Sequence, residues 1–137
     1  MQKIVVVALL LRCSLTWAQD DSHRLPPQEF ERIEFQQYRE ASRVKIRLSD
    51  FAQYKIQEIQ PTQLRIILQG TQVYQRINQL PLDTRYFDSP VRLITILNQE
   101  PPNQSVEVDI FLRKPTRYRH SQREQFVYLD FARDTLD

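Results

Sequence analysis

The strongest constraint on the fold of this chain is a strict alternation of apolar and charged residues that begins at Arg43. Val44, Ile46 and Leu48 occupy every second position, with basic residues between them, and the same alternation returns in residues 106–112. Successive side chains of a β-strand point to opposite faces, so this period of two predicts strands with one buried face and one exposed face.

Further runs rich in β-branched and aromatic residues follow the same rule. Strands are predicted at residues 51–59, 64–68, 91–97 and 126–131, with a weaker one around Ile33 and Phe35 and a short one at 73–77. Prolines fall only in the gaps between these runs, as expected where a backbone N–H is needed for pairing. The pattern predicts an all-β sandwich. The residues predicted to form its core are Val44, Ile46, Leu64, Ile66, Val106, Val108 and Ile110.

The chain contains an internal similarity. Segment 43–70 aligns with segment 105–131, with Val44-x-Ile46 matching Val106-x-Val108 and Tyr54 near the place of Tyr118. Each half reads as strand, turn, strand, break and strand, and three strands cannot bury an apolar face alone. We therefore expect a sandwich of two small, mostly three-stranded sheets built from two pseudo-repeats. The alternative is a chance similarity between two amphipathic β segments.

The N-terminus has the layout of a secretory signal peptide. A short positive region at Lys3 precedes the unbroken apolar run 4–11, and small residues at Thr16 and Ala18 offer a cleavage site before Gln19. The apolar run is far shorter than the roughly 20 residues that span a bilayer as a helix. The alternative is a buried N-terminal element of the fold.

This interpretation divides the chain into three segments. Residues 1–18 are a signal peptide, 19–29 a proline-containing linker, and 30–137 the β-sandwich domain. Cys13 follows Arg12, a bulky cation where lipoprotein processing needs a small residue, so no lipid attachment is predicted there. The mature protein is thus expected to be exported and periplasmic, without a membrane anchor.

The charge balance narrows the class of partner. The chain has 19 Lys and Arg against 17 Asp and Glu, and Lys3 and Arg12 of the leader account for the excess. A mature domain without net charge disfavours a nucleic-acid binder, which shows a basic excess, and a polybasic membrane-surface module.

No catalytic constellation is evident in the sequence. Beyond the leader there are only His23 and His120, and no cysteine, which does not suffice for a zinc hydrolase with several ligands and a general base. A single glycine also leaves no phosphate-binding loop. We predict a non-enzymatic protein without a cofactor or metal.

The pattern V-x-I-x-L, then a tyrosine, a break and L-x-I-x-L, repeated behind a signal peptide, resembles the AMIN domain over residues 33–133. The second half keeps Leu129-Asp130-Phe131, with Asp130 at the family's acidic position, whereas the first half has Leu68-Gln69. AMIN domains precede the catalytic part of periplasmic cell-wall amidases and stand at the N-terminus of type IV pilus secretins. The resemblance implies a sandwich of two three-stranded sheets that binds peptidoglycan and localises its host.

Glycan polymers are usually held by hydrogen-bonding side chains beside an aromatic ring. The segment 113–119 concentrates such groups, and arginines there could grip the carboxylates of stem peptides. The candidate ligand-binding residues are Arg113, Lys114, Arg117, Tyr118, Arg119, Arg65 and Arg92, with Phe111 as a further outward aromatic residue. The alternatives are a solvated basic loop and, for Tyr118, a core position like that of Tyr54.

The outward charges of the two halves are opposite. Lys45 and Arg47 of the first half correspond to Glu107 and Asp109 of the second. Either these are ordinary solvated faces, or the two strands are expected to lie close enough for the opposite charges to meet. Two functions of different classes remain open. One is a peptidoglycan-binding module that positions envelope machinery, for example as the targeting domain of an amidase. The other is an adaptor that docks on a secretin or other envelope protein without binding glycan.

Overall fold

The structure is a computed structural model, and it describes residues 26–133. Within these residues, ten strands and one short 3₁₀ helix follow each other. Their bounds are β1 (Gln28–Gln37), β2 (Ala41–Leu48), β3 (Tyr54–Gln60), β4 (Gln63–Gln69), β5 (Thr71–Gln72), η2 (Arg76–Gln79), β6 (Leu82–Asp83), β7 (Val91–Gln99), β8 (Ser105–Leu112), β9 (Tyr118–Arg123) and β10 (Phe126–Ala132). The predicted all-β fold is confirmed.

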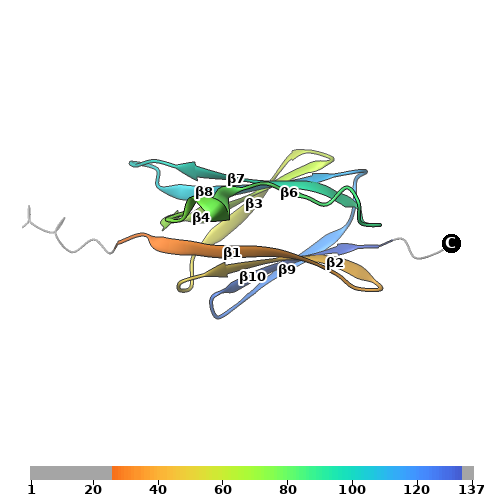
Figure 1. Ribbon diagram of the computed structural model, residues 1–137, viewed down its shortest axis with the longest axis horizontal. Helices are drawn as coiled ribbons and strands as arrows, with labels where there is room; N and C mark the ends of the chain where they lie inside the picture. Colours follow the sequence, from red (N-terminus) through yellow and green to blue (C-terminus); the bar gives the residue numbers. More distant parts are fainter. Residues whose placement is uncertain (1–25, 134–137) are drawn as a thin grey trace, which may run out of the picture.

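Two five-stranded sheets pack face to face (Figure 1). The first sheet has the order β5-β1-β2-β10-β9 and the second the order β3-β4-β8-β7-β6. All neighbouring strands are antiparallel except β1 and β5, which are parallel over two residue pairs.

The prediction of mostly three-stranded sheets is wrong. β1 joins the first sheet beside β2, β7 joins the second beside β8, and the short strands β5 and β6 extend the two edges. The predicted strand at 73–77 is also wrong, because the chain there leaves β5 and forms η2. β1 begins at Gln28, two residues before the expected start of the domain, and the predicted signal peptide lies outside the described residues.

The core lies between the sheets, where the alternation places it. All seven predicted core residues are at most 2% exposed, which confirms the predicted inward faces. Phe30 and Phe131 of the first sheet are the largest fully buried side chains. Since β2, β4, β8 and β10 each turn every second residue to this layer, their other residues form the outer surfaces of the sandwich.

Gly70 stands where the chain turns from β4 into β5. Its φ of +60° lies in the left-handed region, which a glycine adopts without the steric cost of a Cβ. This turn lets β5 pair with the start of β1, so the only glycine of the chain serves to tie the two sheets together.

No helix among residues 26–133 combines the length and the apolar character that crossing a membrane requires.

Candidate functional site

The predicted ligand-binding residues are divided between different surfaces. Arg65 lies on β4, on the outer face of the second sheet, where its guanidinium donates to both oxygens of Asp109 at 2.8 and 3.0 Å. Glu107 lies 3.6 Å away as a second acidic partner. The hydrogen bond to Asp109 raises the pKa of Arg65 above its ordinary value, although burial opposes the rise. The guanidinium of Arg65 is thus held against the outer face of the second sheet by its ion pairs with Asp109 and Glu107.

Arg92 and Arg113 also make contacts within the protein. The guanidinium of Arg92 lies over the ring of Phe111, 5.4 Å from its centroid, on the same outer face as Arg65. Arg113 donates to the backbone carbonyls of Ser89 at 2.9 Å and Arg85 at 2.6 Å, so it fastens the connection between β6 and β7. Lys114 lines a separate hollow with Arg113 and Ser89.

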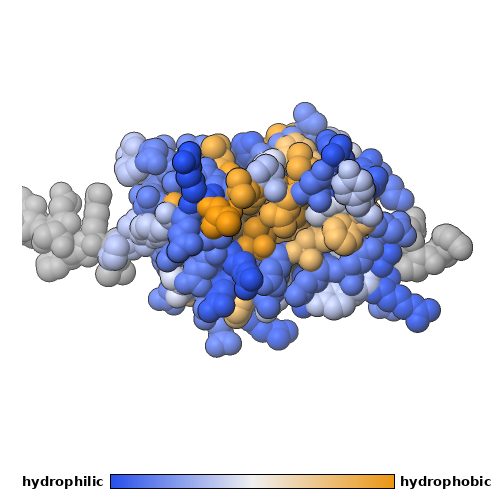
Figure 2. Space-filling view, in the orientation of Figure 1, coloured by the Kyte–Doolittle hydropathy of each residue, from blue (hydrophilic) through white to orange (hydrophobic). Residues whose placement is uncertain are grey.

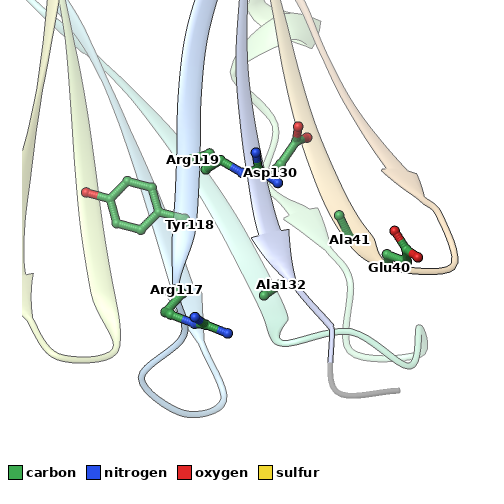
Figure 3. A pocket seen from close by; sticks show the side chains of 7 residues that line it. All are labelled: Glu40, Ala41, Arg117, Tyr118, Arg119, Asp130 and Ala132. Atoms are coloured by element: carbon green, nitrogen blue, oxygen red, sulfur yellow. The ribbon is translucent and has the colours of Figure 1, made fainter. Parts of the chain in front are cut away.

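Arg117, Tyr118 and Arg119 stand at the start of β9, in the first sheet. Figure 3 shows the two arginines on one side of the strand and Tyr118 on the other. Tyr118 is half-buried and packs on the core with its ring 5.8 Å from that of Phe131, in line with the alternative of a core position. Arg117 and Arg119 thus lie together on one solvent-facing surface, next to Asp130. The other candidates lie elsewhere, with Arg65 and Arg92 on the second sheet and Arg113 and Lys114 at the separate hollow.

That surface is the outer face of the first sheet, and we call it the basic face. Pairing of β1, β2, β10 and β9 aligns its side chains in rows across the strands. The six basic and three acidic side chains that these strands present there are Arg32, Arg43, Lys45, Arg47, Arg119 and Arg123, and Glu31, Glu34 and Asp130. The outer face of the second sheet instead presents Lys55, Arg65 and Arg92 against Glu107 and Asp109. The domain thus has one distinctly basic broad surface.

Aromatic rings lie among these cations. Arg43 stacks between two tyrosines, with its guanidinium carbon 5.5 Å from the ring centroid of Tyr38 and 4.8 Å from that of Tyr128. The ammonium of Lys45 lies 4.7 Å from the ring centroid of Phe126. Cation–π contacts of this kind hold flat groups against the sheet and leave the charges at the surface.

Arg43 is fixed further by an ion pair. It donates to both oxygens of Asp130 at 2.8 and 3.0 Å, and this hydrogen bonding raises its pKa above the ordinary value. A fork of two parallel bonds sets the plane of the guanidinium as well as its position. Arg43 and its two tyrosines therefore form a preorganised platform near the turn between β1 and β2.

A hollow of about 470 Å³ opens at one end of the basic face (Figure 3). Arg117 and Arg119 line it from β9, Asp130 from β10, and Glu40 from the turn between β1 and β2. A second hollow lined by Tyr38 and Arg43 shares Glu40 and Asp130 with it, so the two hollows adjoin.

Sequence reasoning missed most of this site. Tyr38, Arg43, Phe126 and Tyr128 were not among the candidates, although each stands at an outward position of its strand. Alternation alone could have placed the side chains outward, but the pairing of β2 with β10, across more than 80 residues, is what joins them. The expected meeting of Lys45 and Arg47 with Glu107 and Asp109 is wrong, because β2 and β8 belong to different sheets.

Within residues 26–133, no three His, Cys, Asp or Glu side chains come together as a metal site. His120 instead faces Tyr54 at the edge of the sandwich, with its Nδ1 2.8 Å from the phenol oxygen.

An apolar ridge forms a second surface feature. Tyr74, Ile77 and Leu80 lie in or next to the 3₁₀ helix η2 and are 51%, 68% and 59% exposed. Asn78 and Gln79 of the same helix are half-buried, whereas Arg76 and Ile77 are exposed. Figure 2 shows apolar residues gathered in the middle of the face on which η2 and β6 lie in Figure 1.

Fold and site together define a β-sandwich whose one sheet carries a basic, aromatic outer face. Neither the models of known protein families nor the curated proteins yield a match to this chain.

Proposed function

We propose that this protein is a non-catalytic binding module that holds an anionic glycan polymer, peptidoglycan, on its basic face. The observation that carries the proposal is the concentration of six basic side chains and three aromatic rings on the outer surface of one sheet. Outside the predicted signal peptide the chain carries equal numbers of basic and acidic residues. The whole protein therefore gains no general attraction to an anionic polymer, and the basic excess is a local property of one surface.

The chemistry of the face suits peptidoglycan in two ways. Arginine forms paired, charge-assisted hydrogen bonds with carboxylates, which the stem peptides carry. Flat rings such as Tyr38 and Tyr128, held beside Arg43, suit the apolar faces of sugar rings. The surface of a sheet is also broad enough to follow an extended chain across several strands.

The strand order supports the resemblance to the AMIN domain and the pseudo-repeat. In the first sheet β2 pairs with β10 and β10 with β9, and in the second β8 pairs with β4 and β4 with β3. The aligned segments match β2, β3 and β4 with β8, β9 and β10. Replacing each strand by its counterpart converts the order β2-β10-β9 of the first sheet into the order β8-β4-β3 of the second, and β1 lies beside β2 as β7 lies beside β8. We propose that the module arose from two repeats and, as an exported periplasmic domain, positions envelope machinery such as an amidase or a pilus secretin.

Co-sedimentation with purified peptidoglycan sacculi tests the proposal. The wild-type protein should pellet with sacculi at low salt and be released as salt rises, since exposed charges are screened over about 10 Å at 0.1 M. The double variant Lys45→Glu/Arg123→Glu reverses two charges of the basic face that have no ion-pair partner within residues 26–133, and it should no longer pellet.

The matched control is Lys55→Glu/Arg92→Glu on the outer face of the second sheet, which changes the net charge by the same amount. It should pellet like the wild type, whereas equal loss in both variants would show a mere effect of net charge. A wild-type protein that stays in solution at low salt, or that binds single-stranded DNA as well as sacculi, would contradict the proposal.

The apolar ridge favours a second candidate function, the adaptor. Beyond Gln28 and Glu29, β1 has no strand partner on its outer edge among the described residues, and β6 covers only Leu93 and Ile94 of β7. Open strand edges beside exposed apolar side chains suit a protein partner that adds a strand. This candidate predicts that Ile77→Asp/Leu80→Asp releases an envelope protein that crosslinks to the wild type in cells, while pelleting with sacculi is absent in both.

A further inference from the structure

We propose that the hollow at the end of the basic face, lined by Glu40, Arg117, Arg119 and Asp130, binds an amino-acid zwitterion: a carboxylate and an ammonium on one carbon atom. The inference rests on the proposed function, because a free amino-acid centre of this kind occurs on the side chain of the diaminopimelate residue in stem peptides. The zwitterion would be the part of peptidoglycan that this end of the basic face binds.

The charges that line the hollow have two signs on two walls. Arg117 and Arg119 approach from β9, while Glu40 approaches from the turn between β1 and β2 (Figure 3). A ligand with only negative charge meets attraction on the β9 wall and repulsion from Glu40. A ligand with a carboxylate beside an ammonium can satisfy both walls at once.

These three charges are not used within the described protein. The side chains of Glu40, Arg117 and Arg119 make no hydrogen bond or ion pair with any residue in 26–133, although they line the same hollow. All three are exposed, so their donors and acceptors are available to a ligand. In contrast, Arg43, the other arginine beside the hollow, already donates two of its N–H groups to Asp130.

Asp130, which lines the hollow from β10, can also accept hydrogen bonds from a ligand. Arg43 occupies one acceptor direction of each of its oxygens, and a carboxylate oxygen has two lone pairs. Asp130 therefore retains acceptor capacity, and it lines the same hollow as Glu40. Asp130 and Glu40 therefore form the acceptor side for an ammonium, and Arg117 and Arg119 form the donor side for a carboxylate.

The experiment titrates the full chain with the synthetic peptide L-Ala-γ-D-Glu-meso-diaminopimelate and follows backbone amide chemical shifts. Two modified peptides serve as comparisons, one with the side-chain amine acetylated and one with the side-chain carboxyl group amidated. Each modification should weaken binding between about threefold and tenfold, the range for one exposed charge-assisted contact. Shifts should be largest at residues 38–43, 117–119 and 130.

Variants test which side chains bind the ammonium and which bind the carboxylate. Glu40→Gln should bind the parent peptide more weakly and no longer distinguish the acetylated one, and Arg117→Gln/Arg119→Gln should no longer distinguish the amidated one. Arg92→Gln, an exposed arginine on the other sheet, should retain wild-type discrimination between all three peptides.

The outcomes separate this inference from the proposed function. Pelleting of wild-type protein with sacculi, together with equal affinity for the three peptides or no affinity for any, would overturn the zwitterion site and leave glycan binding standing. Discrimination between the peptides without pelleting would support the site and overturn polymer binding. Discrimination that survives both Glu40→Gln and Arg117→Gln/Arg119→Gln would place the recognition elsewhere.

Discussion

The phenol oxygen of Tyr54 lies 2.8 Å from Nδ1 of His120, and this contact joins the edge strand of one sheet to the edge strand of the other. The two rings meet edge to face with centroids 5.7 Å apart. Next to them, the side-chain amide of Gln122 on β9 accepts from the backbone N–H of Ala52 and donates to its carbonyl. The sandwich is thus closed along this side by side chains rather than by a shared strand.

The burial of Tyr54 predicts a shifted titration. Burial raises the pKa of Tyr54 above its ordinary value of 10.0, because the protein disfavours the charged phenolate. The absorbance of tyrosinate, measured as wild type minus Tyr54→Phe, should therefore show a step above that value. Since the pKa is raised by folding, the corresponding stability is fully present below pH 10.0 and is lost as pH rises through the folded pKa. A step at or below 10.0 would contradict this burial.

Loss of the Gln122 amide should loosen the same edge. Gln122→Ala leaves the N–H and the carbonyl of Ala52 without their partner, and we expect a cost of about 1–2 kcal/mol in the free energy of unfolding. Ser121→Ala, on the neighbouring exposed residue, is the control and should change it by less than about 0.5 kcal/mol. Urea denaturation measures both, and equal effects would argue against the bridging role of Gln122.

The Arg43–Asp130 fork should show measurable coupling. Both side chains are about one-third exposed, at 34% and 31%, so solvent screening limits the pair to about 1 kcal/mol despite its two parallel bonds. A double-mutant cycle with Arg43→Met and Asp130→Asn measures this interaction. The same cycle on Arg32 and Glu34, where Arg32 is 63% exposed, should give a value near zero. Coupling in the first pair no larger than in the second would show that the platform is not held by its fork.

Adjacent isoleucines on β4 test the register of the second sheet. Ile66 is fully buried, and Ile66→Ala should cost about 2–5 kcal/mol in the free energy of unfolding. Ile67 points to the outer face, opposite Glu107 of β8, so Ile67→Ala should cost about 1 kcal/mol or less. Thermal or urea unfolding of the two variants makes the comparison. A reversed order would mean that the strand is shifted by one residue, since such a shift exchanges its two faces.

Local sequence was sufficient for the longest core strands and their inward faces, although not for the short strands β5 and β6 or for β9. The side chains of a strand alternate with a period of two whatever surrounds it, so Val44, Ile46 and Val108 could be assigned to the core before any pairing was known. The same rule placed Lys45 and Arg47 outward, whereas β9, which carries Arg119, was not predicted as a strand. It could not say which outward residues share a surface.

Only the tertiary structure decided the number of strands in each sheet and the composition of the site. Strand pairing depends on backbone hydrogen bonds between distant segments, which leave no local periodic signal, and so the additions of β1 and β7 were not anticipated. Arg113 had the same composition-based claim to a ligand as Arg119, yet carbonyls of the 85–89 connection occupy its guanidinium. Arg43 and Asp130 meet across 87 residues because β2 and β10 pair in one register, and that register is set by the shared core beneath them.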